Sequence, residues 1–332
     1  MTLKSRIVQF STLGDFLTNP ENETEMKDWA ARAKNENGWF TEDNVLLSLK
    51  EIGQKFLSKE ALESFTTNVS LPTQPKRVGI VAAGNIPLVG FHDMLCVLLS
   101  GHKALLKLSS NDTQLMLRII QKMQELAPEY KEQLEVVDRI KDADAYIATG
   151  SDNSSRYFEH YFGKKPSIIR KNRSSVAVLT GNESTTDLRN LGNDIFRYFG
   201  LGCRNVSKIF VPKDYKFDTL YESIEYWNTI QLHHKYNNNY DYNKSIYLVN
   251  GDKHFDNGFL LLKEDERLVS PLSVVFYEHY ENEADLNLKL QSYEGKLQCI
   301  VGESYIPFGE SQSPNLNDFA DGVNTMDFLM SL

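Results

Sequence analysis

From Lys76 onward, short apolar runs rich in β-branched residues alternate with longer helical stretches, and this alternation limits the fold more than any other feature. The runs are RVGIVAAG (77–84), ALLKLS (104–109), DAYIATGS (144–151) and SVAVLTG (175–181). Helical stretches such as TQLMLRIIQKMQELAP (113–128) separate them. Strands and helices that alternate in this way form a parallel sheet covered by helices. The sequence therefore predicts an α/β fold.

The length of 332 residues indicates two lobes, because a single hydrophobic core stops growing at about 250–300 residues. A second group of apolar runs follows the first: SKIFVP (207–212), SIYLVNG (245–251), SVVFYEHY (273–280) and LQCIVGE (297–303). We interpret the polar tract HHKYNNNYDYNK (233–244) among them as a surface loop. The expected parts are a helical N-terminal segment packing on the first lobe (1–75), the first lobe (76–179), the second lobe (180–310) and a C-terminal segment that returns to the first lobe or forms an interface (311–332).

Polar residues mark the starts of two expected helices. Asn111 and Asp112 precede TQLMLRIIQKMQELAP, and Ser184 precedes TTDLRNLGNDIFRYF (185–199). Side chains of these types accept hydrogen bonds from the first N–H groups of a helix. Gly200 follows the second helix, where we expect a left-handed residue to end it.

Composition narrows the class of partner. The 36 Lys and Arg residues against 45 Asp and Glu residues give a formal charge of −9, so nucleic acid is not an expected partner. The three cysteines are widely spaced and form no metal-ligand pattern, which favours a reducing compartment and no bound metal. Charged residues interrupt the most apolar stretch, 86–108, so we expect a cytoplasmic protein without stable membrane insertion.

Cys203 is the strongest candidate nucleophile among the cysteines. It lies in FGLGCRNVSK (199–208), between a predicted helix and a predicted strand. Gly200 and Gly202 leave room for a substrate beside the thiol, and Arg204 would favour the thiolate. The alternative is a glycine pair that ends a helix and is followed by a core cysteine. The other two cysteines lie in the apolar runs MLCVLL and LQCIV, where we expect buried core residues.

Polar residues at strand ends are candidates for ligand contact, because open α/β sheets bind ligands at the carboxyl ends of their strands. Asn85, in VAAGNIPL, can donate to a developing oxyanion, although a Gly-Asn-Ile-Pro segment can also be an ordinary turn. Lys107, followed by Ser109 and Ser110, suits a ribose or a phosphate. A solvated lysine beside a capped helix is the alternative.

A further strand end lies in ATGSDNSSR, where Gly150 and Ser151 follow the apolar run. An ordinary strand-to-helix turn is the alternative there. The standard phosphate-binding patterns GxGxxG and GxxxxGK[ST] do not occur in the sequence. The individual residues therefore leave the kind of ligand open.

Five short motifs follow one another in a recognisable order: GNIP (84–87), K-x-S (107–109), TGS (149–151), GLGC (200–203) and PFG (307–309). In this order they resemble the aldehyde dehydrogenase superfamily. RKNRSSVAVLTG (170–181), FGLGCRNVSK (199–208) and FADGVNTMDFL (319–329) resemble most closely its acyl-CoA reductase branch, which is related to the bioluminescence fatty acid reductases. The resemblance covers roughly residues 76–332.

The resemblance implies an aldehyde-dehydrogenase-like α/β fold. A Rossmann-like nicotinamide-binding lobe and an α/β catalytic lobe would enclose the active site in the cleft between them. Cys203 would be the nucleophile, and Asn85 would donate to the oxyanion together with the backbone N–H of Cys203. The residues that the resemblance assigns to the cofactor are Lys107, Ser109, Ser110, Gly150, Ser151 and Glu266.

Three departures from the superfamily pattern bear on the reaction. Hydrolytic members carry a glutamate in an ELGGK-like segment, where this sequence reads IIRKNRSS (168–175) with Ile169 or Arg170 in its place. Because this glutamate is missing, we expect the acyl group to be released from the thioester by hydride delivery or by exchange with a thiol, and not by water. No acidic residue follows the ribose lysine around 109–111, so nothing there repels a 2′-phosphate and NADP is permitted. The EEIFGP-like element reads DERLVSP (265–271), where Glu266 is a candidate ribose or nicotinamide contact.

The expected activity is reduction of an acyl-CoA thioester to an aldehyde through an acyl-enzyme on Cys203. The cofactor would be NADPH or NADH, and coenzyme A would be the leaving group. The alternatives are reduction of acyl-carrier-protein or acyl-phosphate donors by the same cysteine, acyl transfer without hydride, and a non-catalytic acyl-binding scaffold. The expected partner is the acyl-CoA substrate, and we expect a homodimer.

Overall fold

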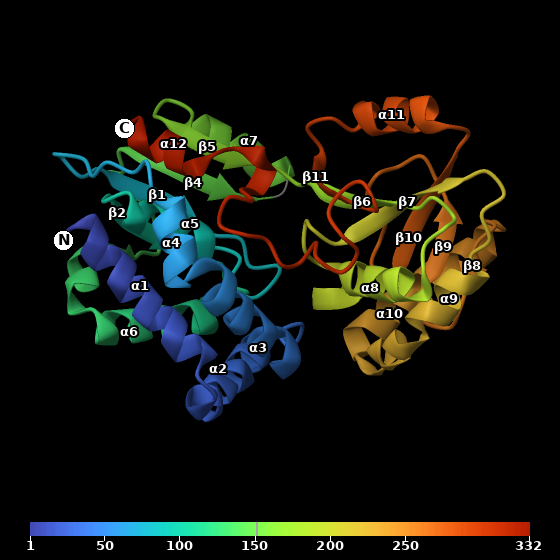
Figure 1. Cartoon of the computed structure of the whole chain (residues 1–332), viewed down its shortest axis with the longest axis horizontal. Helices are drawn as coiled ribbons and strands as arrows, with labels where there is room; N and C mark the ends of the chain where they lie inside the picture. Colours follow the sequence, from blue (N-terminus) through green and yellow to red (C-terminus); the bar gives the residue numbers. More distant parts are fainter. Residues whose placement is uncertain (151) are drawn as a thin grey trace. The chain divides into compact units, whose positions relative to one another are not determined.

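The computed structural model describes residues 1–150 and 152–332, which divide into two compact units. Unit 1 comprises residues 1–172 and 314–332, and unit 2 comprises residues 173–313 (Figure 1). Each unit contains a mainly parallel sheet with helices packed on it. This arrangement confirms the α/β fold that the alternating pattern predicts.

The described residues of unit 1 form a five-stranded parallel sheet in the order β3-β2-β1-β4-β5. Its strands are β1 (Arg77–Val81), β2 (Lys103–Lys107), β3 (Leu134–Val136), β4 (Ala145–Thr149) and β5 (Ser167–Arg170). The middle residues of β1, β2 and β4 are buried, as in a parallel sheet covered on both faces. The strand order reverses between β1 and β4, and open α/β sheets bind ligands at such a point.

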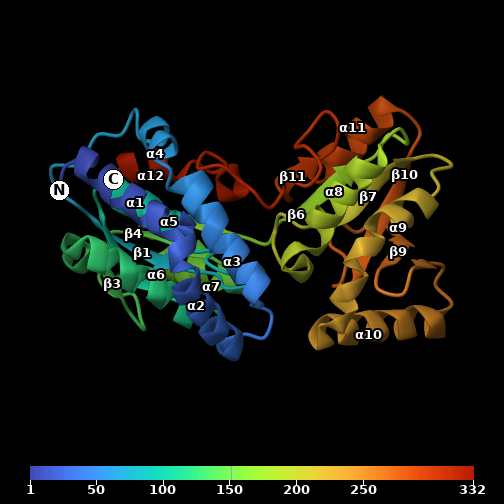
Figure 2. The ribbon, with the colours of Figure 1, turned by 60° about the horizontal axis from the view of Figure 1, so that its bottom comes forward.

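The N-terminal helices complete the core of unit 1. Its helices are α1 (Leu3–Thr18), α2 (Glu23–Glu36), α3 (Glu42–Glu51), α4 (Lys59–Phe65), α5 (Phe91–Leu99), α6 (Thr113–Leu126), α7 (Asp152–Phe162) and α12 (Thr325–Met330). Phe10 of α1, Trp29 of α2 and Leu49 of α3 belong to the same hydrophobic cluster as Val78 and Ile80 of β1. Figure 2 shows α1 and α6 lying beside this sheet.

Unit 2, all of whose residues are described, contains a six-stranded sheet in the order β11-β6-β7-β10-β9-β8. Its strands are β6 (Ser174–Val178), β7 (Val206–Pro212), β8 (Phe255–Asp256), β9 (Leu261–Glu264), β10 (Val274–Tyr280) and β11 (Leu297–Val301). All pair in parallel except β8, which runs antiparallel to β9. Its helices are α8 (Thr185–Phe196), α9 (Asp218–Ile224), α10 (His234–Asn250) and α11 (Glu283–Ser292).

The polar tract 233–244 and the run SIYLVNG form one helix, α10, so the prediction of a loop followed by a strand was wrong. Tyr236, Tyr240, Asn243 and Tyr247 are buried at helical spacing. The tyrosine rings form the buried apolar face of the helix. This face is difficult to recognise in the sequence, because asparagines lie between the tyrosines. Gly251, with φ of 68°, ends the helix in the left-handed conformation.

The boundary between the units falls between residues 172 and 173, seven residues before the expected one (172 against 179). The reason is that β6 pairs with β7 and β11 and so belongs to the second sheet. Residues 314–332 belong to unit 1. There, Thr325 accepts a hydrogen bond from Arg170 at 2.9 Å, and a ring nitrogen of His102 lies 2.9 Å from the carbonyl oxygen of Leu329.

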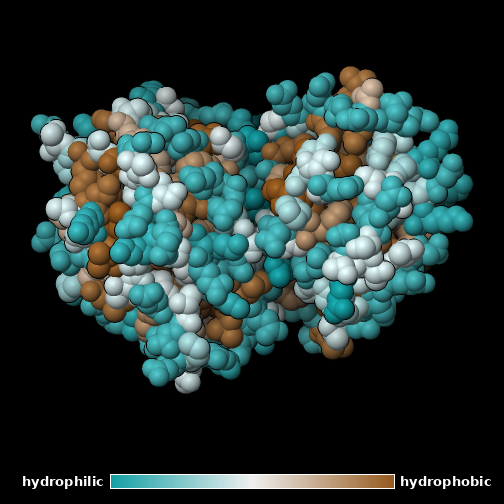
Figure 3. Space-filling model, in the orientation of Figure 1, coloured by the Kyte–Doolittle hydropathy of each residue, from teal (hydrophilic) through white to brown (hydrophobic). Residues whose placement is uncertain are grey.

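The faces of both units that are visible in Figure 3 carry mostly hydrophilic residues with smaller hydrophobic areas between them. None of the helices within residues 1–150 and 152–332 combines the length and the apolar character that a membrane-spanning segment needs. At the start of α8, the Ser184 cap is confirmed, because its hydroxyl accepts the N–H of Asp187 at 3.2 Å.

Candidate active site

The carboxyl ends of β1, β2 and β4 carry the residues that the sequence associates with the cofactor and the oxyanion. Asn85 follows β1, and Lys107 is the last residue of β2; both are exposed. The N–H of Ala82 donates to the carbonyl oxygen of Lys107 at 3.1 Å, so the two strands end side by side. Gly150 follows β4, where an added Cβ would lie 2.8 Å from the ring of Phe158. Its neighbour Ser151 lies outside the described residues.

The turn that carries Asn85 is anchored on the loop after β2. An added Cβ at Gly84 would lie 2.5 Å from Oγ of Ser109, so glycine is needed for this close approach. The buried carboxylate of Asp112 accepts the N–H of Leu88 at 2.7 Å. Burial raises the pKa of Asp112 well above its ordinary value. The Asn85 turn is therefore fixed on both sides, at residues 84 and 88.

The N-terminus of α6 is capped by a residue of α2, and the expectation that Asn111 or Asp112 would cap it was wrong. Oε2 of Glu36 accepts the N–H groups of Thr113 and Gln114, each at 2.9 Å. Asp112 occupies the capping position but makes no side-chain cap, because its carboxylate holds the turn after β1. A carboxylate distant in sequence thus holds the start of α6.

In unit 2, Cys203 follows a turn with an unusual backbone. Tyr198, Phe199 and Gly200 have φ angles of 53°, 58° and 79°. Residues with side chains pay about 1–2 kcal/mol for this left-handed conformation, which persists where the surrounding structure enforces it. Helix α8 accordingly ends at Phe196 and not directly before Gly200 as expected, because the three left-handed residues lie between.

Two polar side chains hold the backbone around Cys203, whose own side chain is half-buried. The amide oxygen of Asn205 accepts the N–H of Gly202 at 2.8 Å. Its amide nitrogen donates to the carbonyl oxygens of Asp194 at 3.0 Å and Arg197 at 2.9 Å. The hydroxyl of Ser175 on β6 donates to the carbonyl oxygen of Cys203 at 3.0 Å. Sequence reasoning missed both residues, because their partners become neighbours only in the folded chain.

The thiol of Cys299 on β11 shares the Ser175 hydroxyl, at a distance of 3.0 Å. Burial raises the pKa of Cys299, and hydrogen bonds from Ser175 and Arg204 oppose this shift. Arg204, which we expected to favour the Cys203 thiolate, thus also interacts with Cys299. Burial also raises the pKa of Cys96 well above its ordinary value, as expected for a core cysteine.

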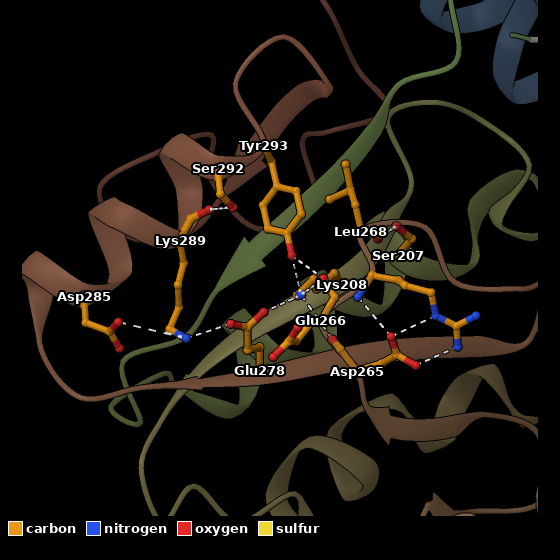
Figure 4. Close-up of polar contacts among 11 residues, drawn as sticks. Ser207, Lys208, Asp265, Glu266, Leu268, Glu278, Asp285, Lys289, Ser292 and Tyr293 are labelled. Carbon is orange, nitrogen blue, oxygen red and sulfur yellow. Dashed lines mark hydrogen bonds and ion pairs between the residues drawn. The ribbon is translucent and has the colours of Figure 1, made fainter.

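The loop that carries Glu266 is held by a buried lysine (Figure 4). Lys208 on β7 is fully buried and donates to the carbonyl oxygens of Asp265 at 3.1 Å and Glu266 at 2.9 Å. The same ammonium group contacts Glu278 at 2.5 Å, and the hydroxyl of Tyr293 also donates to the carbonyl oxygen of Glu266. The Glu266 side chain itself is exposed. Its backbone is thereby fixed while its carboxylate remains accessible.

A pocket within unit 2 lies between the Gly200 turn and the segment that begins at the end of the DERLVSP motif. Its lining includes Phe199, Gly200, Tyr236, Pro271 and Leu272. The walls are largely apolar, and the strained turn that leads to Cys203 forms one of them.

The PFG motif is anchored on α8. The buried carboxylate of Asp194 accepts the N–H groups of Gly309 at 2.6 Å and Ser311 at 3.0 Å, and burial raises its pKa. Among the residues that the structure describes, no group of three or more His, Cys, Asp or Glu side chains is placed to hold a metal ion. Asn85, Lys107, Ser109, Ser110 and Gly150 all belong to unit 1, whereas Cys203 and Glu266 belong to unit 2.

Comparison with known proteins gives a family and a fold. Residues 27–226 match the family model described as acyl-CoA reductase (LuxC). No protein with a curated description matches the sequence significantly.

Solved structures share the fold at low sequence identity. An oxidoreductase from Marinobacter aquaeolei has a TM-score of 0.69 at 12% identity, over 91% of this chain and 73% of that one. An NADP-dependent enzyme from E. coli has a TM-score of 0.67 at 14% identity, over 91% and 73%. Betaine aldehyde dehydrogenase from Staphylococcus aureus, solved with NAD+, has a TM-score of 0.65 at 13% identity, over 91% and 75%. These similarities confirm the aldehyde-dehydrogenase-like fold.

Proposed function

The chain belongs to the acyl-CoA reductase (LuxC) family, and from this premise we propose that it reduces an acyl-CoA thioester to an aldehyde with NADPH or NADH. The observation that carries the proposal is the Cys203 loop. A strained turn precedes this half-buried cysteine, and hydrogen bonds from Ser175 and Asn205 fix the backbone on both sides of it. Such a loop presents one thiol in a defined orientation, as covalent catalysis requires.

In the proposed first step, Sγ of Cys203 attacks the carbonyl carbon of the acyl-CoA. The carbonyl electron pair moves to oxygen, where the N–H of Cys203 donates a hydrogen bond to the oxyanion. The oxyanion then collapses, the bond to the coenzyme A sulfur breaks, and coenzyme A leaves as a thiolate. An acyl thioester on Cys203 remains.

The residues at the strand ends of unit 1 fit a nicotinamide cofactor. They lie at the carboxyl ends of the strands beside the point where the strand order reverses, where open α/β sheets bind ligands. Lys107 provides an exposed cation for the ribose or the phosphates. When bound, the reduced nicotinamide supplies the hydride that converts the thioester to a thiohemiacetal. Breaking the bond to Cys203 then releases the aldehyde.

Arg170 supports reduction over hydrolysis. This residue or its neighbour Ile169 stands where hydrolytic members of the superfamily carry a base, and Arg170 is buried. It contacts the carboxylate of Asp93 at 2.5 Å and the hydroxyl of Thr325 at 2.9 Å. A guanidinium held in this way cannot accept a proton from water. The acyl-enzyme therefore lacks a base at this position for release as a free acid.

The test uses the purified full chain with NADPH or NADH and acyl-CoAs of several chain lengths. Oxidation of the nicotinamide and release of free thiol are followed together with the mass of the protein. We expect both signals, and an added acyl mass without cofactor, in the wild type and in Cys299→Ala. Cys203→Ala should lose all three. Thiol release without nicotinamide oxidation would show acyl transfer and contradict reduction. Turnover by Cys203→Ala at the wild-type rate would show that Cys203 is not the nucleophile.

A further inference from the structure

The side chain of Asp194 is buried at the end of α8, where a carboxyl group is unfavourable for two reasons. Asp194 lies in the last turn of the helix, and its side chain is fully buried. The C-terminus of a helix carries a partial negative charge, which disfavours an anion there. Moving a carboxyl group out of water also costs free energy, unless the group is hydrogen-bonded. A residue that departs from both rules is a candidate for a role in function.

Both oxygens of the Asp194 carboxyl group bind the backbone of a segment that follows much later in the chain. Oδ2 accepts the N–H of Gly309 at 2.6 Å, and Oδ1 accepts the N–H of Ser311 at 3.0 Å. Gly309 has a φ of 91°, and an added Cβ would lie 3.1 Å from Cβ of Asn190, one turn earlier in α8. The segment 309–311 therefore approaches α8 closely, and Asp194 fixes it to the end of the helix.

The backbone at this end of α8 also holds Asn205. The amide nitrogen of Asn205 donates to three carbonyl oxygens at 3.0, 3.2 and 2.9 Å, those of Asp194, Ile195 and Arg197. The amide oxygen of the same side chain accepts the N–H of Gly202, the residue before Cys203, at 2.8 Å. The segment 309–311 and the loop of Cys203 are thus attached to the same end of one helix.

The strained turn makes these attachments important. Tyr198, Phe199 and Gly200 lie between the end of α8 and Cys203, all with left-handed backbone. Such a conformation persists only where the surrounding structure enforces it. Asn205 holds the turn from the side of the cysteine. Its own three acceptors stay in place only if the end of α8 stays in place.

We propose that Asp194 is a positioning residue for the acylation of Cys203. The inference rests on the proposed function, in which the Cys203 thiolate attacks an acyl-CoA. Asp194 fixes the end of α8 to the segment 309–311 and so keeps the acceptors of Asn205 in place. Asn205 then holds the N–H of Gly202 and the thiol beside it in the orientation that attack on the carbonyl carbon needs.

Asp194→Asn tests this role, because it keeps the size of the side chain and replaces one acceptor oxygen by an amide that donates. Gly309 or Ser311 then loses its acceptor, and the end of α8 should loosen. Hydrogen exchange of peptides that cover residues 198–205, measured by mass spectrometry on the full chain, should become about tenfold faster.

The second measurement is the rate at which an acyl-CoA acylates Cys203 in the absence of a nicotinamide. The maximal rate in Asp194→Asn should be about tenfold lower than in the wild type. The acyl-CoA concentration that gives half of this rate should change less than about threefold, because the variant alters orientation and not binding. Unchanged exchange in 198–205, or an unchanged maximal rate, would overturn the inference.

Asp187→Asn is the matched control, because it changes the same residue type at the other end of α8. The carboxylate of Asp187 accepts the N–H of Ser184 at 3.0 Å and its hydroxyl at 2.7 Å. This variant should be less stable than the wild type but should acylate at the wild-type rate, with unchanged exchange in 198–205. Equal effects of the two variants on acylation would show that Asp194 only stabilises the helix.

The double variant Asp194→Asn with Asn205→Ala tests whether the two residues act along one path. Because both act through the N–H of Gly202, the double variant should slow acylation by less than the product of the two single effects. A decrease equal to that product would contradict the shared path and overturn the inference.

Gly309→Ala disturbs the same contact from the opposite side and decides the matter if Asp194→Asn does not fold. The added Cβ meets Asn190, so exchange in 198–205 should again become faster and acylation slower. Wild-type values for both would overturn the inference. No acylation of the wild type by any acyl-CoA would refute the proposed function, and exchange in 198–205 would then still show whether Asp194 holds the loop of Cys203.

Discussion

The ammonium group of Lys208 lies 2.5 Å from the carboxylate of Glu278, with the lysine fully buried on β7. Lys289 contacts the other oxygen of the same carboxylate at 2.7 Å. The pair therefore joins two neighbouring strands, β7 and β10, and fixes the backbone at Asp265 and Glu266 as well. Removing Lys208 leaves the carboxylate of Glu278 with Lys289 as its remaining partner, and the carbonyl oxygen of Asp265 loses the lysine as a donor.

Lys208→Met is expected to lower the free energy of unfolding by about 3–5 kcal/mol, the range found when a buried ion pair loses one partner. Urea-induced unfolding of wild type and variant measures this difference in the free energy of unfolding. Lys213→Met is the control, because Lys213 pairs with Glu281 at 3.2 Å on the surface, where the two side chains are 66% and 65% exposed. The free energy of unfolding of Lys213→Met should be lower than that of the wild type by less than about 1 kcal/mol. Equal losses in the two variants would show that the buried network does not stabilise unit 2.

Glu278 should make the stability of the protein depend on pH. Burial alone raises its pKa, but hydrogen bonds from Lys208 and Lys289 outweigh burial and hold the pKa below its ordinary value. The folded state then binds this proton less readily than the unfolded state, whose glutamate has a pKa of about 4.3. The stabilisation is complete above that pH and is lost as the pH falls through the lower, folded-state pKa.

Glu278→Gln removes this titration. The difference in free energy of unfolding between wild type and variant should be largest near neutral pH and should shrink below about pH 4. Urea titrations at several pH values provide the comparison. A difference that stays constant, or that grows as the pH falls, would contradict the lowered pKa of Glu278.

Asn205 is expected to act on the reaction through the backbone around Cys203. Asn205→Ala leaves the N–H of Gly202 and three carbonyl oxygens without their partner, so the loop should lose its defined geometry. Acylation of Cys203 by an acyl-CoA should slow by about 10- to 100-fold, equivalent to about 1.4–2.8 kcal/mol. Binding of NADH to unit 1 should not change. Asn250→Ala, at the exposed end of α10, is the control and should acylate at the wild-type rate.

The apolar runs predicted β1, β2, β4, β6, β7, β10 and β11, because their residues are buried in a parallel sheet and carry a strong local pattern. β3, β5, β8 and β9 were not predicted. The four residues of β5 include the buried Arg170, whose partner Asp93 lies on α5. Helix α10 was also missed, because tyrosine and asparagine at helical spacing do not look like an apolar face. Local pattern thus predicts strands well and aromatic-polar helices poorly.

The residues of the candidate site also differ in how well the sequence identifies them. Cys203 and Asn85 are identified by short motifs, because each motif lies within a few residues of chain. Ser175, Asn205 and Glu36 have no such motif. Ser175 contacts the backbone of Cys203 from β6, and Glu36 reaches α6 only because α2 packs against that helix. Residues that hold a site from another element become recognisable only in the folded structure.

Arg170→Glu, which introduces the kind of residue that hydrolytic relatives carry, is expected to destabilise the protein and not to create a hydrolase. The new carboxylate would face that of Asp93, and Thr325 of α12 would lose its donor. A loss of about 3–5 kcal/mol in the free energy of unfolding should follow, with faster hydrogen exchange in α12. Lys171→Glu makes the same charge change at a half-exposed neighbour, paired with Glu159 at 3.0 Å, and should cost less than about 1 kcal/mol. Wild-type stability of Arg170→Glu, together with release of free acid from an acyl-CoA, would contradict this prediction. Position 170 would then be one where a glutamate can act as the catalytic base, and Arg170 would not be needed for the structure.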